Sequence, residues 1–123
     1  MTTVDLASLE DLLRSLLLTQ QYQLAAQYTK RYQDIIIRVP AQTLSGQPSS
    51  PDIEGVLHAY VDLCAEELSL HESGQIPDPI WQNWKEGIIA GNRLPAVNVL
   101  WQHHFATGPY ESLRKFLEKN GVL

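Results

Sequence analysis

Cysteine is nearly absent from this chain, since Cys64 is the only one among its 123 residues. A single cysteine excludes a disulfide within the chain and any zinc site built mainly from thiolates. It is compatible with a reducing compartment, so we expect a cytoplasmic protein. The N-terminus supports that expectation, because Asp5, Glu10 and Asp11 stand where a secretory signal would carry positive charge.

Long hydrophobic runs are also missing. The most apolar run, Leu16–Leu18, is three residues long, whereas a membrane-spanning helix needs about twenty. The sequence therefore predicts no membrane span.

Positive charge is absent from the middle of the chain. Neither lysine nor arginine occurs between Arg38 and Lys85. The acidic residues in that stretch are Asp52, Glu54, Asp62, Glu66, Glu67, Glu72 and Asp78. Nucleic-acid binding requires clustered cations, and this surface would repel phosphate, so we expect no nucleic-acid partner.

What the chain does contain is enough apolar material for one ordinary domain. Hydrophobic residues make up 44% of the sequence, which is typical of globular proteins. A chain of this length buries roughly two-thirds of its unfolded surface, so stability alone requires no metal or cofactor, and we predict none. We interpret residues 1–123 as a single domain.

Proline and glycine divide the second half of the chain at regular intervals. Proline is tolerated at the first turn of a helix, and glycine commonly follows its last turn. The pattern predicts a four-helix region over residues 51–123, with Ser50 and Asp78 as N-caps. The expected segments run from Pro51 to Gly74, from Pro79 to near Gly91, from Pro95 to Gly108 and from Pro109 to Gly121. Residues 41–50 read as a loop.

The first forty residues form an N-terminal helical segment with two apolar stripes, one through Leu6, Leu13 and Leu17, the other through Leu24 and Tyr28. Since each residue advances by about 100° around a helix, the two stripes would be offset by roughly 80° on one straight helix. One straight helix over residues 5–39 would be about 52 Å long, against a radius of gyration near 14 Å for a compact chain of this size.

We therefore favour a break near Thr19, Gln20 and Gln21, which would make a helical hairpin. The alternative is one long helix whose overhang is covered by a second subunit. In either case the sequence predicts an all-α fold, a five- or six-helix bundle.

Residues 60–88 resemble a group of uncharacterised all-helical bacterial proteins. In that group a helix reading D-L-C-x-E is followed by a glycine turn, W-x-x-W and G-I. The matching residues here are Asp62, Leu63, Cys64, Glu66, Gly74, Ile76, Trp81, Trp84, Gly87 and Ile88. The resemblance implies a helical fold and carries no activity.

One face of the helix expected after Pro51 carries groups that bind metals. His58, Asp62 and Glu66 follow one another at four-residue steps, and His103 or His104 is a further ligand candidate from a second helix. The simpler interpretation is a solvated polar face, which we favour because the Glu-x-x-His spacing of di-iron bundles is missing.

Three other features have both a chemical and a structural interpretation. Glu67 and His71 are spaced as an acid–base pair, but His71 also suits a helix C-terminus. Cys64 lies within an apolar stripe without a cationic neighbour in sequence, which indicates a buried thiol rather than a nucleophile. Tryptophans 81, 84 and 101 have the helical spacing of core or interface residues.

Two classes of function follow from these observations. We favour a non-enzymatic interaction or structural module, because no nucleophile, phosphate loop or metal spacing is evident. Its partner would be a second copy of the chain, bound through the N-terminal helical segment to form a homodimer, or another protein. The alternative is a small enzyme or ligand-binding bundle that uses the face of His58, Asp62 and Glu66.

Overall fold

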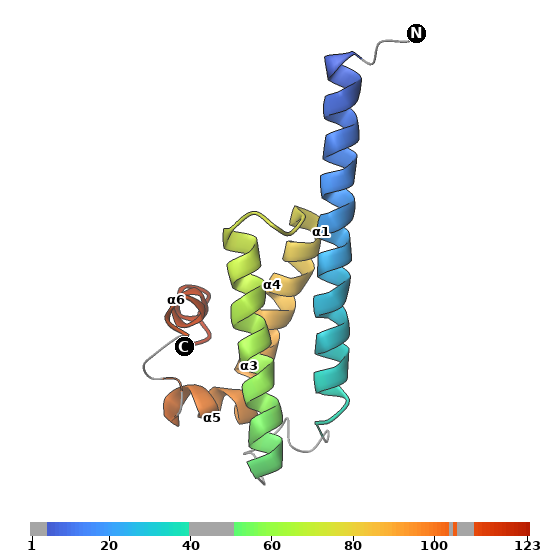
Figure 1. Cartoon of the computed structure of the whole chain (residues 1–123). Helices are drawn as coiled ribbons and strands as arrows, with labels where there is room; N and C mark the ends of the chain where they lie inside the picture. Colours follow the sequence, from blue (N-terminus) through green and yellow to red (C-terminus); the bar gives the residue numbers. More distant parts are fainter. Residues whose placement is uncertain (1–4, 40–50, 104, 106–109) are drawn as a thin grey trace.

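The computed structural model describes residues 5–39, 51–103, 105 and 110–123. Every regular element in these ranges is an α-helix, which confirms the all-α prediction. The helices are α1 (Leu6–Ile36), α3 (Pro51–Glu72), α4 (Asp78–Arg93), α5 (Pro95–His103) and α6 (Glu111–Lys119) (Figure 1). The predicted loop over residues 41–50 lies outside the described residues.

Helix α1 is a single helix of 31 residues. It begins after Asp5, whose carboxylate accepts a hydrogen bond from the backbone N–H of Ser8 at 2.7 Å and so caps the helix. The helix continues without interruption through residues 19–21, so the predicted hairpin is wrong and the segment is one long helix. The reason is that its two stripes face different surroundings, one of them the rest of the chain and the other solvent. That a second subunit covers its overhang stays a prediction.

Helices α1, α3 and α4 form the body of the molecule, and α5 and α6 pack on the side away from α1 (Figure 1). Contacts along α1 and α3 run in opposite directions: Gln21 reaches Gly74, and Arg31 reaches Glu66. The two helices are therefore antiparallel. Only the C-terminal half of α1 takes part, and its N-terminal half extends beyond the body.

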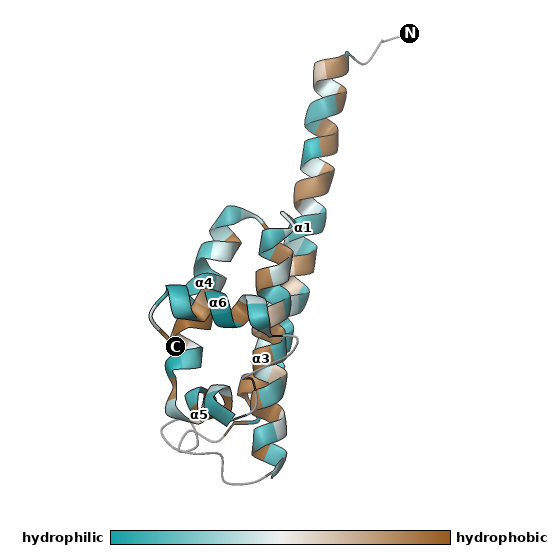
Figure 2. Ribbon diagram, turned by 90° about the vertical axis from the view of Figure 1, so that its left-hand side faces the viewer, coloured by the Kyte–Doolittle hydropathy of each residue, from teal (hydrophilic) through white to brown (hydrophobic). Residues whose placement is uncertain are grey.

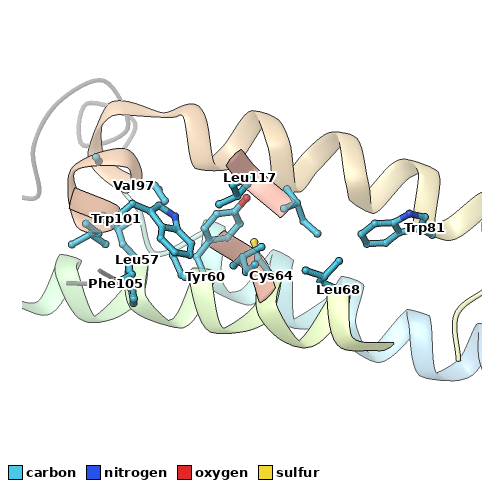
Figure 3. Packing of buried hydrophobic residues seen from close by; sticks show 14 of the residues in the cluster. Leu57, Tyr60, Cys64, Leu68, Trp81, Val97, Trp101, Phe105 and Leu117 are labelled. Atoms are coloured by element: carbon cyan, nitrogen blue, oxygen red, sulfur yellow. The ribbon is translucent and has the colours of Figure 1, made fainter. Parts of the chain in front are cut away.

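The core lies between α3, α4, α5 and α6, and Ala25 joins it from α1. Leu57, Tyr60, Cys64 and Leu68 occupy successive turns of α3 and face side chains of the other helices (Figure 3). Spacings of three and four residues place them on one face, as the sequence predicts. A polar residue within this core, Asn92, is fully buried but satisfied. Its amide oxygen accepts from the indole N–H of Trp101 at 2.8 Å, and its amide nitrogen donates to the carbonyl of Ile88.

Two of the predicted glycine stops are confirmed. Gly74 and Gly121 have φ of +73° and +75°, and in both turns the following N–H donates to a carbonyl five residues earlier. Helix α4 passes through Gly91 and ends two residues later, at Arg93, which is near Gly91 as predicted. The stop predicted at Gly108 and the N-cap predicted at Ser50 lie outside the described residues. Asp78 is not the N-cap of α4: it lies in the first turn, and Pro77 occupies the cap position without a side-chain hydrogen bond.

No helix in the described part of the chain is long and apolar enough to cross a membrane.

Candidate functional site

The three polar residues on one face of α3 each interact with a different part of the structure. The imidazole of His58 lies against the ring of Phe105, with centroids 4.9 Å apart. The Asp62 carboxylate accepts a hydrogen bond from the Tyr110 hydroxyl. This hydrogen bond raises the pKa of Tyr110 to about 12.

Glu66, the third of these residues, pairs with Arg31 of α1. Nη2 of Arg31 lies 2.7 Å from one carboxylate oxygen, and Nη1 lies 3.2 Å from the other. This bidentate contact lowers the pKa of Glu66. Tyr28 donates to the same carboxylate at 3.4 Å. The Glu66 side chain thus links α1 to α3.

The histidines proposed as additional ligands do not complete a metal site in the part of the chain that can be described. His103 is exposed in the last turn of α5, and His104 lies outside the described residues. Within the described ranges, no three histidine, cysteine, aspartate or glutamate side chains are grouped to hold a metal ion.

Glu67 and His71 are not joined by a hydrogen bond in the described structure. The His71 ring instead stacks on Trp81, with centroids 4.0 Å apart and planes 4° from parallel. Glu67 points to the interior and is only 6% exposed. The two side chains therefore do not form the acid–base pair that their spacing suggested.

Cys64 is fully buried, as its position in the apolar stripe predicts. Burial raises the pKa of its thiol to about 12, so the thiolate form is scarce at neutral pH. Among the tryptophans, Trp81 and Trp101 are core residues, whereas Trp84 is half-buried and lines a cavity described below.

The most unusual surface is the N-terminal half of α1, residues 6–18, which we call the overhang. It carries seven leucines, and every one is 44% to 72% exposed. They are Leu6, Leu9, Leu12, Leu13, Leu16, Leu17 and Leu18. Figure 2 shows the apolar residues of this projecting stretch lying clear of the rest of the chain.

Within the overhang the leucines follow a heptad spacing. Leu6, Leu9, Leu13 and Leu16 are separated by three, four and three residues, which is the a/d pattern of helices that pack along a seam. Leu12 and Leu17 flank this seam and widen it. The next two positions of the pattern are Gln20 and Gln23, so the seam ends where α1 reaches the body.

A second feature is a cavity of about 200 Å³ between α1, α3 and α4. It adjoins a more apolar cavity of about 240 Å³, and Tyr32, Tyr60 and Gly87 line both. The first cavity is lined by Thr29 and Tyr32 from α1, Tyr60 and Glu67 from α3, and Asn83, Trp84 and Gly87 from α4.

Glu67 supplies the acidic group of this cavity. Its carboxyl makes no hydrogen bond to any described residue, yet its oxygens are not sealed from solvent, so they reach the cavity. Burial raises the pKa of Glu67 to about 8, a shift that the charge of Arg31 partly opposes. This role of Glu67 was not predicted from the sequence. The available signal was that Glu67 lies seven residues after Tyr60 and hence on the buried face of α3.

No family model matches this chain, and no curated protein or solved structure is significantly similar to it.

Proposed function

We propose that this protein is a non-enzymatic interaction module that forms a homodimer through the leucine-rich overhang of α1. The proposal rests on one observation: seven leucines, each at least 44% exposed and none packed against the hydrophobic core, lie together on one projecting helical segment. Monomeric proteins rarely expose contiguous apolar patches larger than a few hundred Å². A surface of this kind is typical of an interface.

The heptad spacing favours a second copy of the same chain as the occupant. A seam of leucines at a and d positions packs against an equal seam, each side chain fitting between those of the facing helix. Two-fold association is the commonest arrangement in which one surface covers itself. It would also support the overhang, since about thirteen residues of isolated helix are only marginally stable in water.

The charges of the overhang disfavour a membrane surface as the occupant. Helices that lie on membranes usually carry lysine and arginine on their polar face. Here the polar positions include Glu10 and Asp11 against one cation, Arg14. The proposal includes a cytoplasmic location, which accords with the reduced, buried thiol of Cys64.

Sedimentation velocity over a range of micromolar concentrations tests the proposal. We expect the wild-type protein to sediment as a dimer and Leu13→Asp to sediment as a monomer, because a charge buried without a partner in the seam is strongly unfavourable. The matched control is Ser15→Asp, which places the same charge on the same helix but outside the seam.

Far-UV circular dichroism should show that both variants keep the fold, because neither residue contacts the body. A monomeric wild type overturns the proposal. A dimer that tolerates Leu13→Asp as well as Ser15→Asp overturns it too.

A further inference from the structure

The cavity beside Glu67 is independent of the overhang and has the features of a ligand site. Its acidic side chain is more than nine-tenths buried, has no hydrogen-bond partner among the described residues and opens into the empty volume. Because its carboxylate oxygens stay open to the cavity and accept no hydrogen bond from the described chain, a ligand that supplies a hydrogen-bond donor would be stabilised there.

The rest of the lining indicates the chemical class of that ligand. Three aromatic side chains, Tyr32, Tyr60 and Trp84, border the cavity. The faces of aromatic rings attract cations. Apart from the phenols, Glu67 is the only ionisable group among the described residues that line it. A carboxylate surrounded by aromatic rings favours a positively charged ligand.

An inorganic cation suits this lining less well than an organic one. Calcium and magnesium take six or more oxygen ligands, from protein or water. Most of the cavity surface is apolar, and the Tyr60 hydroxyl already donates to the carbonyl of Gly87 at 3.3 Å. At about 200 Å³ the cavity is smaller than the usual range for drug-sized ligands, which begins at about 300 Å³.

We propose that this cavity binds a small primary alkylammonium ion. The carboxylate of Glu67 accepts hydrogen bonds from the ammonium N–H groups, and the alkyl chain lies among Tyr32, Tyr60 and Trp84. The site requires no second subunit, so its existence does not depend on the proposed dimer.

The charged groups around Glu67 make binding sensitive to pH. On the α1 side, Arg31 is already paired with Glu66 of α3, so its charge is largely compensated. Helix α4 contributes the uncharged Asn83 and Trp84. Because burial raises the pKa of Glu67 to about 8, an ammonium ion must displace a proton at neutral pH. Affinity should therefore rise by about two orders of magnitude between pH 6 and pH 9, in proportion to the ionised fraction.

Isothermal titration calorimetry with butylammonium tests the proposal. An alkylamine of this kind stays protonated up to about pH 10, as lysine does. We expect saturable binding at pH 9, markedly weaker binding at pH 6, and no comparable binding of 1-butanol. At pH 7, titrations in two buffers with different heats of ionisation should show close to one proton released per ligand bound.

Two variants complete the test. Glu67→Gln removes the charge and should weaken butylammonium binding at pH 9 at least tenfold. Glu72→Gln removes the same charge from an exposed position on the same helix and should leave binding unchanged. Absence of butylammonium binding at pH 9 overturns the proposal. Equal binding of 1-butanol, or unchanged binding by Glu67→Gln, overturns it as well.

Discussion

At the scale of single residues, Gly91 shows how closely two helices approach. A Cβ atom at this position would lie 1.8 Å from the hydroxyl oxygen of Tyr60 and 2.7 Å from its Cζ. We therefore expect Gly91→Ala to lower the free energy of unfolding by about 1–3 kcal/mol, as overpacking typically does. Gly55→Ala is the control, since nothing lies within 4 Å of its Cβ. It should be neutral or stabilising by up to about 1 kcal/mol.

Urea denaturation of Gly91→Ala in wild-type and Tyr60→Phe backgrounds measures the contact directly. Without the hydroxyl the nearest atom recedes from 1.8 to 2.7 Å, so the cost of the added methyl group should fall but not vanish. An identical cost in both backgrounds would show that the crowding does not involve Tyr60.

Glu67 should make the stability of the protein depend on pH. Burial raises its pKa from 4.5 to about 8, so between these values the folded state binds a proton that the unfolded state has released. The free energy of unfolding must therefore fall as pH rises from about 4.5 through 8 and then level off. Since each tenfold change in proton affinity is worth about 1.4 kcal/mol, the loss by pH 9 is on the order of 5 kcal/mol.

Glu67→Gln removes this ionisation and should be more stable than the wild type at pH 9, with the difference vanishing near pH 4. Urea titrations at several pH values measure it. If the two proteins show parallel stability curves over the whole range, the carboxyl is not buried in the folded state.

At the scale of elements, α4 is held by two tryptophans that face different neighbours. Trp81 is 5% exposed, stacks on His71 of α3 and lies 5.9 Å from the ring of Phe116 in α6. Trp84 is half-buried beside Tyr28 of α1. We expect Trp81→Ala to cost about 3–5 kcal/mol and Trp84→Ala distinctly less, because a partly exposed side chain gains less from burial.

Thermal or urea unfolding of the two variants measures this difference. Equal losses of unfolding free energy in the two variants would show that the cavity side of α4 is packed as tightly as its core side. Full stability of Trp81→Ala would contradict the position of this residue in the core.

The ends of a helix were predictable where a proline or a glycine with positive φ fixes the backbone conformation. Proline marks the first residue of α3 and of α5, and glycine with positive φ follows α3 and α6. The close contact at Gly91 was not predicted, because a glycine near a helix end and a glycine in a close helix contact look the same in sequence. Glu67 was missed for a related reason: spacing places a residue on a face, but only packing decides which carboxylate on that face loses its water.

At the scale of the whole molecule, the fold class followed from the sequence, whereas the path of the first forty residues did not. The offset between the two stripes of α1 and the length of a single helix over this segment favoured a hairpin. In the structure Leu24 packs against the core, while the leucines of the overhang remain exposed. A surface that contacts nothing in its own chain gives no intramolecular signal for its orientation, so the sequence left both arrangements open.

Removing the overhang should separate association from folding. A chain that begins at Thr19 keeps every residue of α1 that lies in or against the hydrophobic core, and threonine is a good N-cap for the shortened helix. We expect this truncated protein to be a folded monomer whose melting temperature does not change with concentration. The full-length protein should melt at higher temperature as its concentration rises, because association stabilises the folded state by mass action. Differential scanning calorimetry at two concentrations tenfold apart measures both melting temperatures.

A truncated protein that fails to fold would show that the overhang supports the body directly. A truncated protein whose melting temperature still depends on concentration would place the interface on the body of the molecule.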